Sequence, residues 1–429
     1  MGGENLTGAT WLATADGQQA LREAWHVRRH HQGDPAAAAT AMRRARADLL
    51  PSQCTSALLQ AELQELAAHR YGIDEGSLLL TRAGLEQGTR PEVSRARIGM
   101  LNLVAGSQVV DATAGIGLDS LSFVSAGMRV TAVEQDPITA TFLRANLRGG
   151  SVLEGDITDP AVLAQATRGL TPQDLVFVDP SRRSGTRSRD GSRAHPERDP
   201  QRWSPPWSFV EGLAARFRVC AKVAPGLPSA RVPVGWQAAW IATRQGPVET
   251  CLISWPALPA PRRACLVRPN SAHGDTSAHG DLVEVLDDDL AGVTAPDQPA
   301  SSRCMDYLHE PSRVVVQAEL VDCLARRTGL NRVAADTHWL TSSSPLDPAR
   351  ATGMLASYRV LDELPSGPKA LRAALRSRGI VDVTIKSRGS RLDAPGWRDR
   401  LRLPEGPSAI LVFLTCAGTA RAFLVEHQA

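Results

Sequence analysis

A run of β-branched residues, Val109-Val110, ends in the carboxylate Asp111 and is followed closely by two glycines, Gly115 and Gly117. Two glycines let the backbone turn sharply after a strand and approach a ligand without interference from Cβ atoms. The helix that follows would offer its unpaired backbone N–H groups to that ligand. This feature predicts a strand, a tight loop and a helix that together bind a nucleotide cofactor.

Acidic residues end three further apolar runs in the same way. Glu134, Asp156 and Asp179 each follow a short stretch rich in valine and leucine. Ligands of an open parallel sheet bind outside the carboxyl ends of its strands. We therefore expect these three side chains and Asp111 to meet in one crevice at the edge of a parallel sheet.

The spacing of the acidic residues bears on the choice of cofactor. A dinucleotide fingerprint, G-x-G-x-x-G, is broken because Ser120 replaces its third glycine. Glu134 comes about one helix and one strand after Asp111, which suits a carboxylate that binds two ribose hydroxyls. Asp156 can accept from an adenine amino group while the backbone of Ile157 lies beside the base. An acidic cluster repels a pyrophosphate but attracts a sulfonium and an α-amino group, so S-adenosylmethionine is favoured over NAD.

The sequence Asp179-Pro180-Ser181-Arg182-Arg183 is the predicted catalytic segment. A carboxylate and a backbone carbonyl freed by proline can both accept from an exocyclic N–H group, and two acceptors orient the nitrogen lone pair. Methyl transfer from a sulfonium is an in-line displacement, so positioning can supply most of the catalysis and no metal is required. Arg182 and Arg183 either bind a phosphate or a substrate carbonyl through a planar fork, or are solvated loop residues.

The motifs DATAGIGLDS, VTAVEQDP, EGDITD and FVDPSRR resemble the successive motifs of class I S-adenosylmethionine-dependent methyltransferases, across roughly residues 91 to 255. The likeness is greatest to the RNA guanine-N2 branch. It implies that Asp111, Gly115 and Gly117 hold the methionine end, Glu134 the ribose, Asp156 the adenine edge, and Asp179-Pro180 the reacting amine. Ala112, Asp119, Gln135 and Ile157 complete the expected cofactor set.

Arg182 departs from the pattern of the amino-methylating relatives, which usually have an aromatic residue at that place to stack on a flipped base. Guanine N2 is therefore preferred over adenine N6 as the methylated atom. Trp203 and Trp207 surround a proline pair and either form a stacking platform or anchor the core.

The expected fold class is α/β: a Rossmann-like class I methyltransferase sheet with an N-terminal helical domain and a C-terminal α+β THUMP-like domain. The expected ranges are a helical domain at 1–90, the methyltransferase domain at 91–265, a flexible insertion at 266–302, a helical connector at 303–357 and the THUMP-like domain at 358–429. The insertion contains the repeated segment SAHGD, whose histidines are not expected to bind a metal. From Tyr358 onward the order strand, helix, strand, helix, strand, strand is expected.

A capping box is expected at the entry to the methyltransferase domain. Thr89 and Glu92 have the T-x-x-E spacing, and Pro91 suits the first helical position, which predicts a helix from 91 to about Val104. The preceding segment, TRAGLEQGTRPEV, resembles the one before the cofactor loop in a bacterial methyltransferase family with a THUMP-like tail. It is either a lid on the cofactor or a linker.

The tail carries the clearest basic bias of the chain, with 11 basic and 5 acidic side chains over residues 358–402. Arg372, Arg376, Lys386 and Arg388 are the candidate contacts to structured RNA, either tRNA or rRNA, as the resemblance to an RNA-binding module implies. The alternative is a solvated helix face. The net charge of the whole chain, +3, is too small to indicate nucleic-acid binding by itself.

Composition excludes other classes of protein. No apolar run approaches the length of a membrane helix, and the N-terminus lacks a signal-peptide pattern, so the chain is expected in the cytoplasm. The seven cysteines never form C-x-x-C and fit reduced thiols. Two other functions stay open: a cofactor-binding RNA-binding protein without turnover, and a small-molecule methyltransferase. The oligomeric state is open as well.

Overall fold

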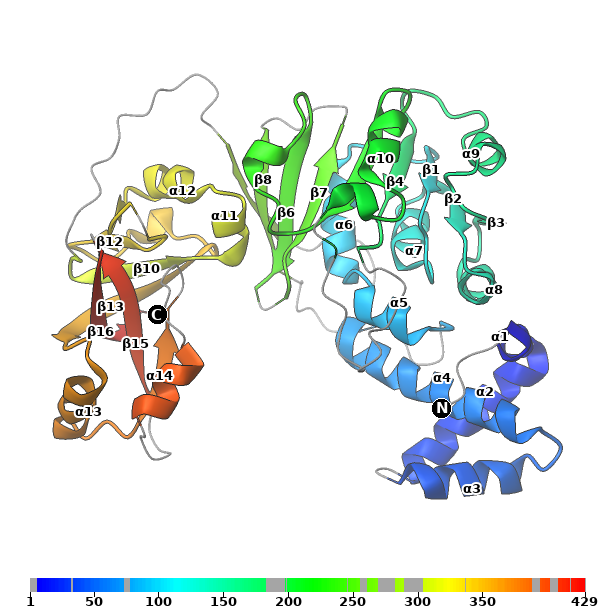
Figure 1. Cartoon of the computed structure of the whole chain (residues 1–429), viewed down its shortest axis with the longest axis horizontal. Coiled ribbons are helices and arrows are strands. Elements are labelled where there is room, and N and C mark those ends of the chain that lie inside the picture. The colour runs from blue at the N-terminus through cyan, green and yellow to red at the C-terminus, as the bar shows by residue number, and fades with distance from the viewer. Residues whose placement is uncertain are drawn as a thin grey trace. The chain divides into compact units, whose positions relative to one another are not determined.

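The computed structural model (Figure 1) describes residues 6–31, 34–72, 78–182, 197, 199–244, 246–254, 261–268, 282–288, 304–335, 337–387, 394–401, 408–416 and 418–428. The chain divides into two compact units, one formed mainly by residues 1–224 and the other mainly by 259–429. No helix among the described residues is both long enough and apolar enough to cross a membrane. None of the seven cysteines, all of which lie within the described residues, forms a disulfide.

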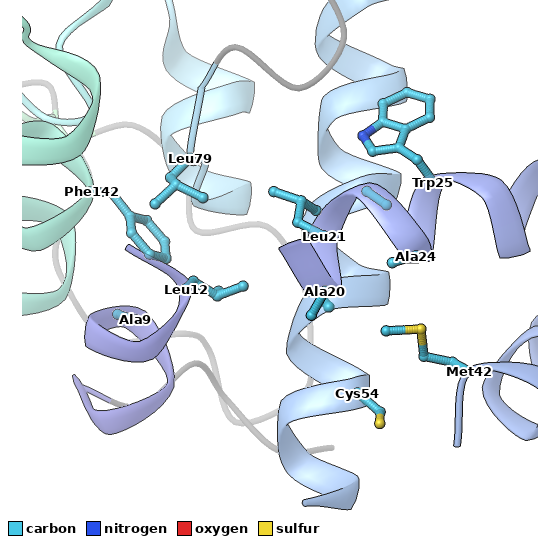
Figure 2. Close-up of a cluster of buried hydrophobic side chains, with 12 residues drawn as sticks. Ala9, Leu12, Ala20, Leu21, Ala24, Trp25, Met42, Cys54, Leu79 and Phe142 are labelled. Carbon is cyan, nitrogen blue, oxygen red and sulfur yellow. The ribbon is translucent and has the colours of Figure 1, made fainter. Parts of the chain in front are cut away.

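The first unit begins with helices, as predicted. They are α1 (Leu6–Leu12), α2 (Ala15–His30), α3 (Pro35–Ala45), α4 (Pro51–Tyr71) and α5 (Arg82–Gln87). Figure 2 shows their core, in which Leu12 and Leu79 lie beside Phe142 from α8 (Pro137–Asn146). The side chain of Asn146 bonds both backbone groups of Leu79, at 2.7 and 2.8 Å. The N-terminal helices are therefore joined to α8 by apolar and polar contacts.

The first sheet has the strand order β3-β2-β1-β4-β5-β7-β6-β8-β9. Its strands are β1 (Gln108–Asp111), β2 (Arg129–Glu134), β3 (Ser151–Glu154), β4 (Leu175–Val178), β5 (Val219–Val223), β6 (Gln237–Thr243), β7 (Glu249–Ile253), β8 (Arg262–Arg268) and β9 (Leu282–Asp287). Strands β1 to β5 pair in parallel. Crossover helices include α7 (Leu118–Ser125), α9 (Pro160–Ala166) and α10 (Trp207–Ala214). The carboxyl ends of five neighbouring strands thus lie along one edge, which confirms the predicted α/β class.

Helix α6 (Pro91–Met100) precedes β1 and begins where predicted, but its cap and its C-terminal end differ from the prediction. Pro91 is the first helical residue, but the N-cap is Arg90, and its side chain makes no capping bond. The capping box is wrong because the hydroxyl of Thr89 bonds Asp119 and Lys222 instead. The helix stops before Val104 because Asn102 has a φ of 47°, a left-handed conformation that no α-helix accommodates.

The range expected to be a flexible insertion, 266–302, contains strand β9, which pairs antiparallel with β8. Cross-strand ion pairs support this pairing, with Arg263 bound to Asp287 at 2.5 Å and Arg262 to Asp288 at 2.8 Å. The SAHGD repeat lies outside the described residues.

The range expected to be a helical connector, 303–357, contains strands as well as helices. Its elements are β10 (Tyr307–Pro311), α11 (Arg313–Gln317), α12 (Val321–Thr328), β11 (Asn331–Arg332), β12 (Leu340–Ser342) and the start of β13 (Leu355–Leu364). The helical interpretation of residues 307–311 was wrong because β10 is an inner strand that pairs with both β12 and β13. Tertiary pairing determines its conformation more than local periodicity does.

The second sheet has the order β11-β12-β10-β13-β16-β15-β14. After β13 come α13 (Pro368–Ser377), β14 (Asp382–Lys386), α14 (Ala394–Leu401), β15 (Ser408–Cys416) and β16 (Thr419–His427). This is the predicted succession of strand, helix, strand, helix, strand and strand. Its core contains Leu308, Trp339, Tyr358 and Phe423.

Candidate active site

The loop after β1 makes the tight turn that its two glycines predict. Gly115 and Gly117 have φ angles of 56° and 93°, which favour glycine. A Cβ on Gly117 would lie 2.6 Å from Cδ1 of Leu143, whereas a Cβ on Gly115 would meet no atom within 4 Å. Gly117 is therefore required by the fold itself, and Gly115 leaves open space beside the loop where a cofactor can approach.

Asp111 is the last residue of β1 and is buried. It is 1% exposed and accepts a hydrogen bond of 2.6 Å from Oγ of Ser120 in α7. Burial raises its pKa to about 7, and the neighbouring charges of Asp119 and Asp179 add to the rise. In this conformation the carboxyl group of Asp111 ties the end of β1 to the helix that follows.

We expect Asp111→Asn to remove part of the pH dependence of stability. The raised pKa means that the folded state holds this proton more tightly than the unfolded chain does. The stability that this bound proton contributes is fully present below the unfolded pKa near 3.8 and is lost as the pH rises through the folded pKa of about 7. From pH 5.5 to 8.5 the wild type should lose about 2 kcal/mol that the asparagine variant keeps. Urea unfolding at both pH values measures this, and equal losses in the two proteins would contradict it.

Glu134 ends β2 and touches the glycine loop. One carboxylate oxygen accepts from the backbone N–H of Gly115 at 2.9 Å and the other from that of Asp136 at 2.8 Å. Burial raises its pKa. Each carboxylate oxygen can accept further bonds, so the group remains able to bind two ribose hydroxyls.

We expect Glu134→Gln to weaken S-adenosylmethionine binding by roughly 10- to 100-fold, the worth of a charge-assisted hydrogen bond. The amide can accept only one of the two backbone N–H bonds, so the Gly115 loop also loses support. Glu154→Gln is the matched control, because Glu154 ends the adjacent strand and is exposed beside Arg144. Isothermal titration calorimetry gives the affinities. Equal affinities in all three proteins would refute the role of Glu134.

The other predicted cofactor residues occupy different environments. Asp156 is exposed and accepts from the backbone and hydroxyl of Thr158, each at 2.8 Å. Ile157 is buried, and Gln135 is exposed directly after β2. Ala112 is buried and continues the pairing of β1 with β4 through its backbone N–H.

Asp179 follows β4 and stands half-exposed at the sheet edge. Its backbone N–H donates to Oγ1 of Thr113 at 2.7 Å, which joins it to the cofactor loop. Pro180 is buried, and Ser181 pairs with Ser204 through two backbone hydrogen bonds of 2.8 and 3.0 Å. Backbone hydrogen bonds therefore hold Asp179 and Ser181 of the predicted catalytic segment.

Arg182 is partly exposed, and its carbonyl accepts from the backbone of Glu197. Arg183 lies outside the described residues. Trp203 is buried, and its indole N–H donates to the carbonyl of Glu197 at 3.1 Å, so it anchors the segment rather than offering a stacking face. Trp207 packs edge-on against Trp203.

Asp119 belongs to a buried ionic cluster. Arg97 of α6, 0% exposed, bonds one carboxylate oxygen of Asp119, and Ser94 donates to the same oxygen. Lys222 of β5 lies 3.4 Å from the other oxygen. Burial favours the neutral acid, but the two cations hold the pKa of Asp119 well below its usual value.

Sequence reasoning missed Lys222, Thr89 and Arg97 as parts of this site. Lys222 Nζ is 2.6 Å from Oδ2 of Asp179, and the side chain of Lys222 is 9% exposed. One signal was available: only three of the 48 basic residues are lysines. Lys222 is one of these three, and its compact ammonium differs from the planar guanidinium that the chain uses elsewhere.

The predicted RNA contacts of the tail are only partly available at the surface. Arg376 is exposed on α13, while Arg372 donates to the carbonyl of Arg400. Lys386 is engaged within the domain, because its ammonium lies 2.7 Å from Glu310 and 5.2 Å from the ring centre of Tyr358. Lys386 therefore supports the fold in this structure, and Arg388 lies outside the described residues.

Comparison with known proteins identifies the family. Residues 73–159 match a family model described as "Putative SAM-dependent methyltransferase", and residues 355–427 match one described as "THUMP domain-like". An uncharacterized S-adenosylmethionine-dependent methyltransferase of Mycobacterium tuberculosis H37Rv is 30% identical over 350 residues, which is 79% of this chain and 85% of that protein. The chain belongs to the S-adenosylmethionine-dependent methyltransferase family. S-adenosylmethionine is accordingly the cofactor of this methyltransferase.

Two further similarities are to a solved structure and to a ribosomal RNA methyltransferase. A solved structure described as a "putative methyltransferase from Porphyromonas gingivalis W83" aligns with a TM-score of 0.69 and 17% identity, covering 96% of this chain and 98% of that one. The ribosomal RNA small subunit methyltransferase J of Pseudomonas paraeruginosa is 30% identical over 129 residues, which is 27% of this methyltransferase and 42% of that protein. The first establishes a shared fold, and the second is a similarity to an enzyme named for ribosomal RNA.

Proposed function

We propose that this methyltransferase methylates an exocyclic base amine, preferably guanine N2, in structured RNA such as rRNA or tRNA. The observation that carries the proposal is the state of Asp179. Among the described residues, Oδ2 of Asp179 accepts from Lys222, while Oδ1 has no hydrogen bond. A half-exposed carboxylate with one oxygen held and one available can accept from an amine N–H group.

In the proposed mechanism, the amine donates to Oδ1 of Asp179 and to the backbone carbonyl at Asp179-Pro180. This directs its lone pair at the methyl carbon of the sulfonium, close to attack distance. The new N–C bond forms as the C–S bond breaks, the electron pair goes to sulfur, and Asp179 takes the proton that the amine releases.

For the cofactor, we propose that Gly115 and Gly117 hold its methionine end, Glu134 its ribose, and Asp156 and Ile157 its adenine. The open space beside Gly115 and the free capacity of Glu134 and Asp156 fit these roles. Asp111 would act as a positioning residue for the loop. Ala112 and Gln135 are proposed to line the same edge.

The choice of RNA rests on two similarities. The methyltransferase is similar over 129 residues to an enzyme named ribosomal RNA small subunit methyltransferase J, and its tail matches a THUMP-like model. Exposed Arg376 is the proposed phosphate contact of the tail. Binding through such contacts falls steeply with salt concentration.

Nucleoside mass spectrometry of total RNA from a gene-deletion strain tests this function. One N2-methylguanosine should disappear from the deletion strain and return on complementation with the wild-type gene, but not with the Asp179→Asn gene. An unchanged profile would count against RNA as substrate. Cofactor binding without transfer to any RNA would favour a binding protein, and transfer to a small molecule would favour the third alternative.

A further inference from the structure

Lys222 makes contacts that go beyond those of a simple counter-ion. Its ammonium donates to Oδ2 of Asp179 at 2.6 Å, to Oγ1 of Thr89 at 2.7 Å and to Oδ2 of Asp119 at 3.4 Å. An ammonium has three N–H donors, so each has its own acceptor. The three oxygens come from the end of β4, the entry to α6 and the first turn of α7.

The charges around this lysine balance. Arg97 and Lys222 face Asp119 and Asp179, so two cations match two carboxylates in a largely buried setting. Arg97 itself lies over the ring of Phe177, 4.8 Å from its centre. The Lys222 ammonium is also bonded to Thr89 and Asp119, so it has little freedom to follow the side chain of Asp179 if that side chain rotates.

We propose that Lys222 is a positioning residue for methyl transfer, which holds Oδ2 of Asp179 so that Oδ1 faces the amine and its departing proton. This inference rests on the proposed function of Asp179. The reaction itself is unchanged: nitrogen bonds to the methyl carbon, the sulfonium bond breaks, and the proton goes to Oδ1. Lys222 neither gains nor loses a proton, since its three donors stay engaged.

The residue type at position 222 supports this role. A tetrahedral ammonium can direct three bonds to three separate elements, whereas a guanidinium is planar and presents its donors as a fork. Arginine at this place would keep the positive charge but not the directions of the bonds. Lys222→Arg therefore separates charge from geometry, and Lys369→Arg is the control because Lys369 is exposed on α13.

The test combines two measurements: the rate of methyl transfer to RNA, and the ratio of two inhibitor affinities, which needs no methyl acceptor. Sinefungin carries an amine where the cofactor has its methyl sulfonium, so its affinity relative to S-adenosylhomocysteine reports how Oδ1 of Asp179 faces that point. In Lys222→Arg we expect the preference for sinefungin to fall at least 5-fold and kcat on RNA at least 10-fold. The dissociation constant for S-adenosylmethionine should change less than 3-fold. Lys369→Arg should match the wild type in all three.

An unchanged sinefungin preference in Lys222→Arg would overturn the proposal. If Lys222→Arg does not fold, the sinefungin preference of Thr89→Val provides the same test. This substitution removes one acceptor of the Lys222 ammonium and keeps the volume of the side chain at position 89. A wild type that transfers no methyl group to RNA would defeat the proposed function instead. The sinefungin ratio would still decide the role of Lys222.

Discussion

Asp179→Asn is expected to reduce methyl transfer by about a thousand-fold, within the range typical of losing a positioned proton acceptor. Asparagine keeps the size of the side chain and one acceptor oxygen. Its amide cannot take the proton from the amine, and its NH2 group would oppose either Lys222 or the incoming amine. The affinity for S-adenosylmethionine should stay within a factor of three, because the proposed cofactor contacts follow β1, β2 and β3, whereas Asp179 follows β4.

Single-turnover transfer and calorimetry with the same protein preparation separate these two effects. Asp159→Asn serves as the control, since Asp159 is an exposed carboxylate that caps α9. A drop in cofactor affinity that accounts for the whole loss of rate would assign Asp179 to cofactor binding and not to the reacting amine.

Asp119→Ala is expected to lower the free energy of unfolding by about 3–5 kcal/mol, the cost of breaking a buried ion pair and leaving its partner charged. Arg97 is fully buried and would lose its carboxylate partner. Lys222 would lose one of its two carboxylate partners. An open cofactor-binding acid would show a much smaller effect.

Urea denaturation of the wild type and the variant measures this difference. Glu154→Ala is the surface comparison, because Glu154 pairs with Arg144 while both side chains are largely exposed. The free energy of unfolding of Glu154→Ala should fall by no more than about 1 kcal/mol. Equal, small losses in the two variants would show that Asp119 is not the centre of a buried cluster.

The parts of the fold that could be predicted are those determined locally. Gly115 and Gly117 adopt the left-handed backbone that a tight loop after β1 needs, and this shows in the residue types themselves. The apolar runs before Asp111, Glu134 and Asp179 became neighbouring parallel strands. The succession of elements from Tyr358 onward also followed from local periodicity.

The parts that could not be predicted depend on partners distant in sequence. Thr89 has the spacing of a helix cap, yet its hydroxyl bonds Lys222, which is 133 residues away. Asp119 follows the glycine loop like a ligand contact, but Arg97 and Lys222 draw it into the interior. Lys386 lies in a basic stretch that suggests phosphate binding, although its ammonium already contacts Glu310 and Tyr358. Local patterns do not contain these pairings.

The central claim is that Asp179 presents a base amine of RNA to S-adenosylmethionine. The most direct measurement incubates purified enzyme with cofactor carrying a labelled methyl group and RNA from a deletion strain, and then digests the RNA to nucleosides. We predict label in N2-methylguanosine with the wild type and none with Asp179→Asn. Bound cofactor with no label in RNA, or label in a different nucleoside, would contradict the account.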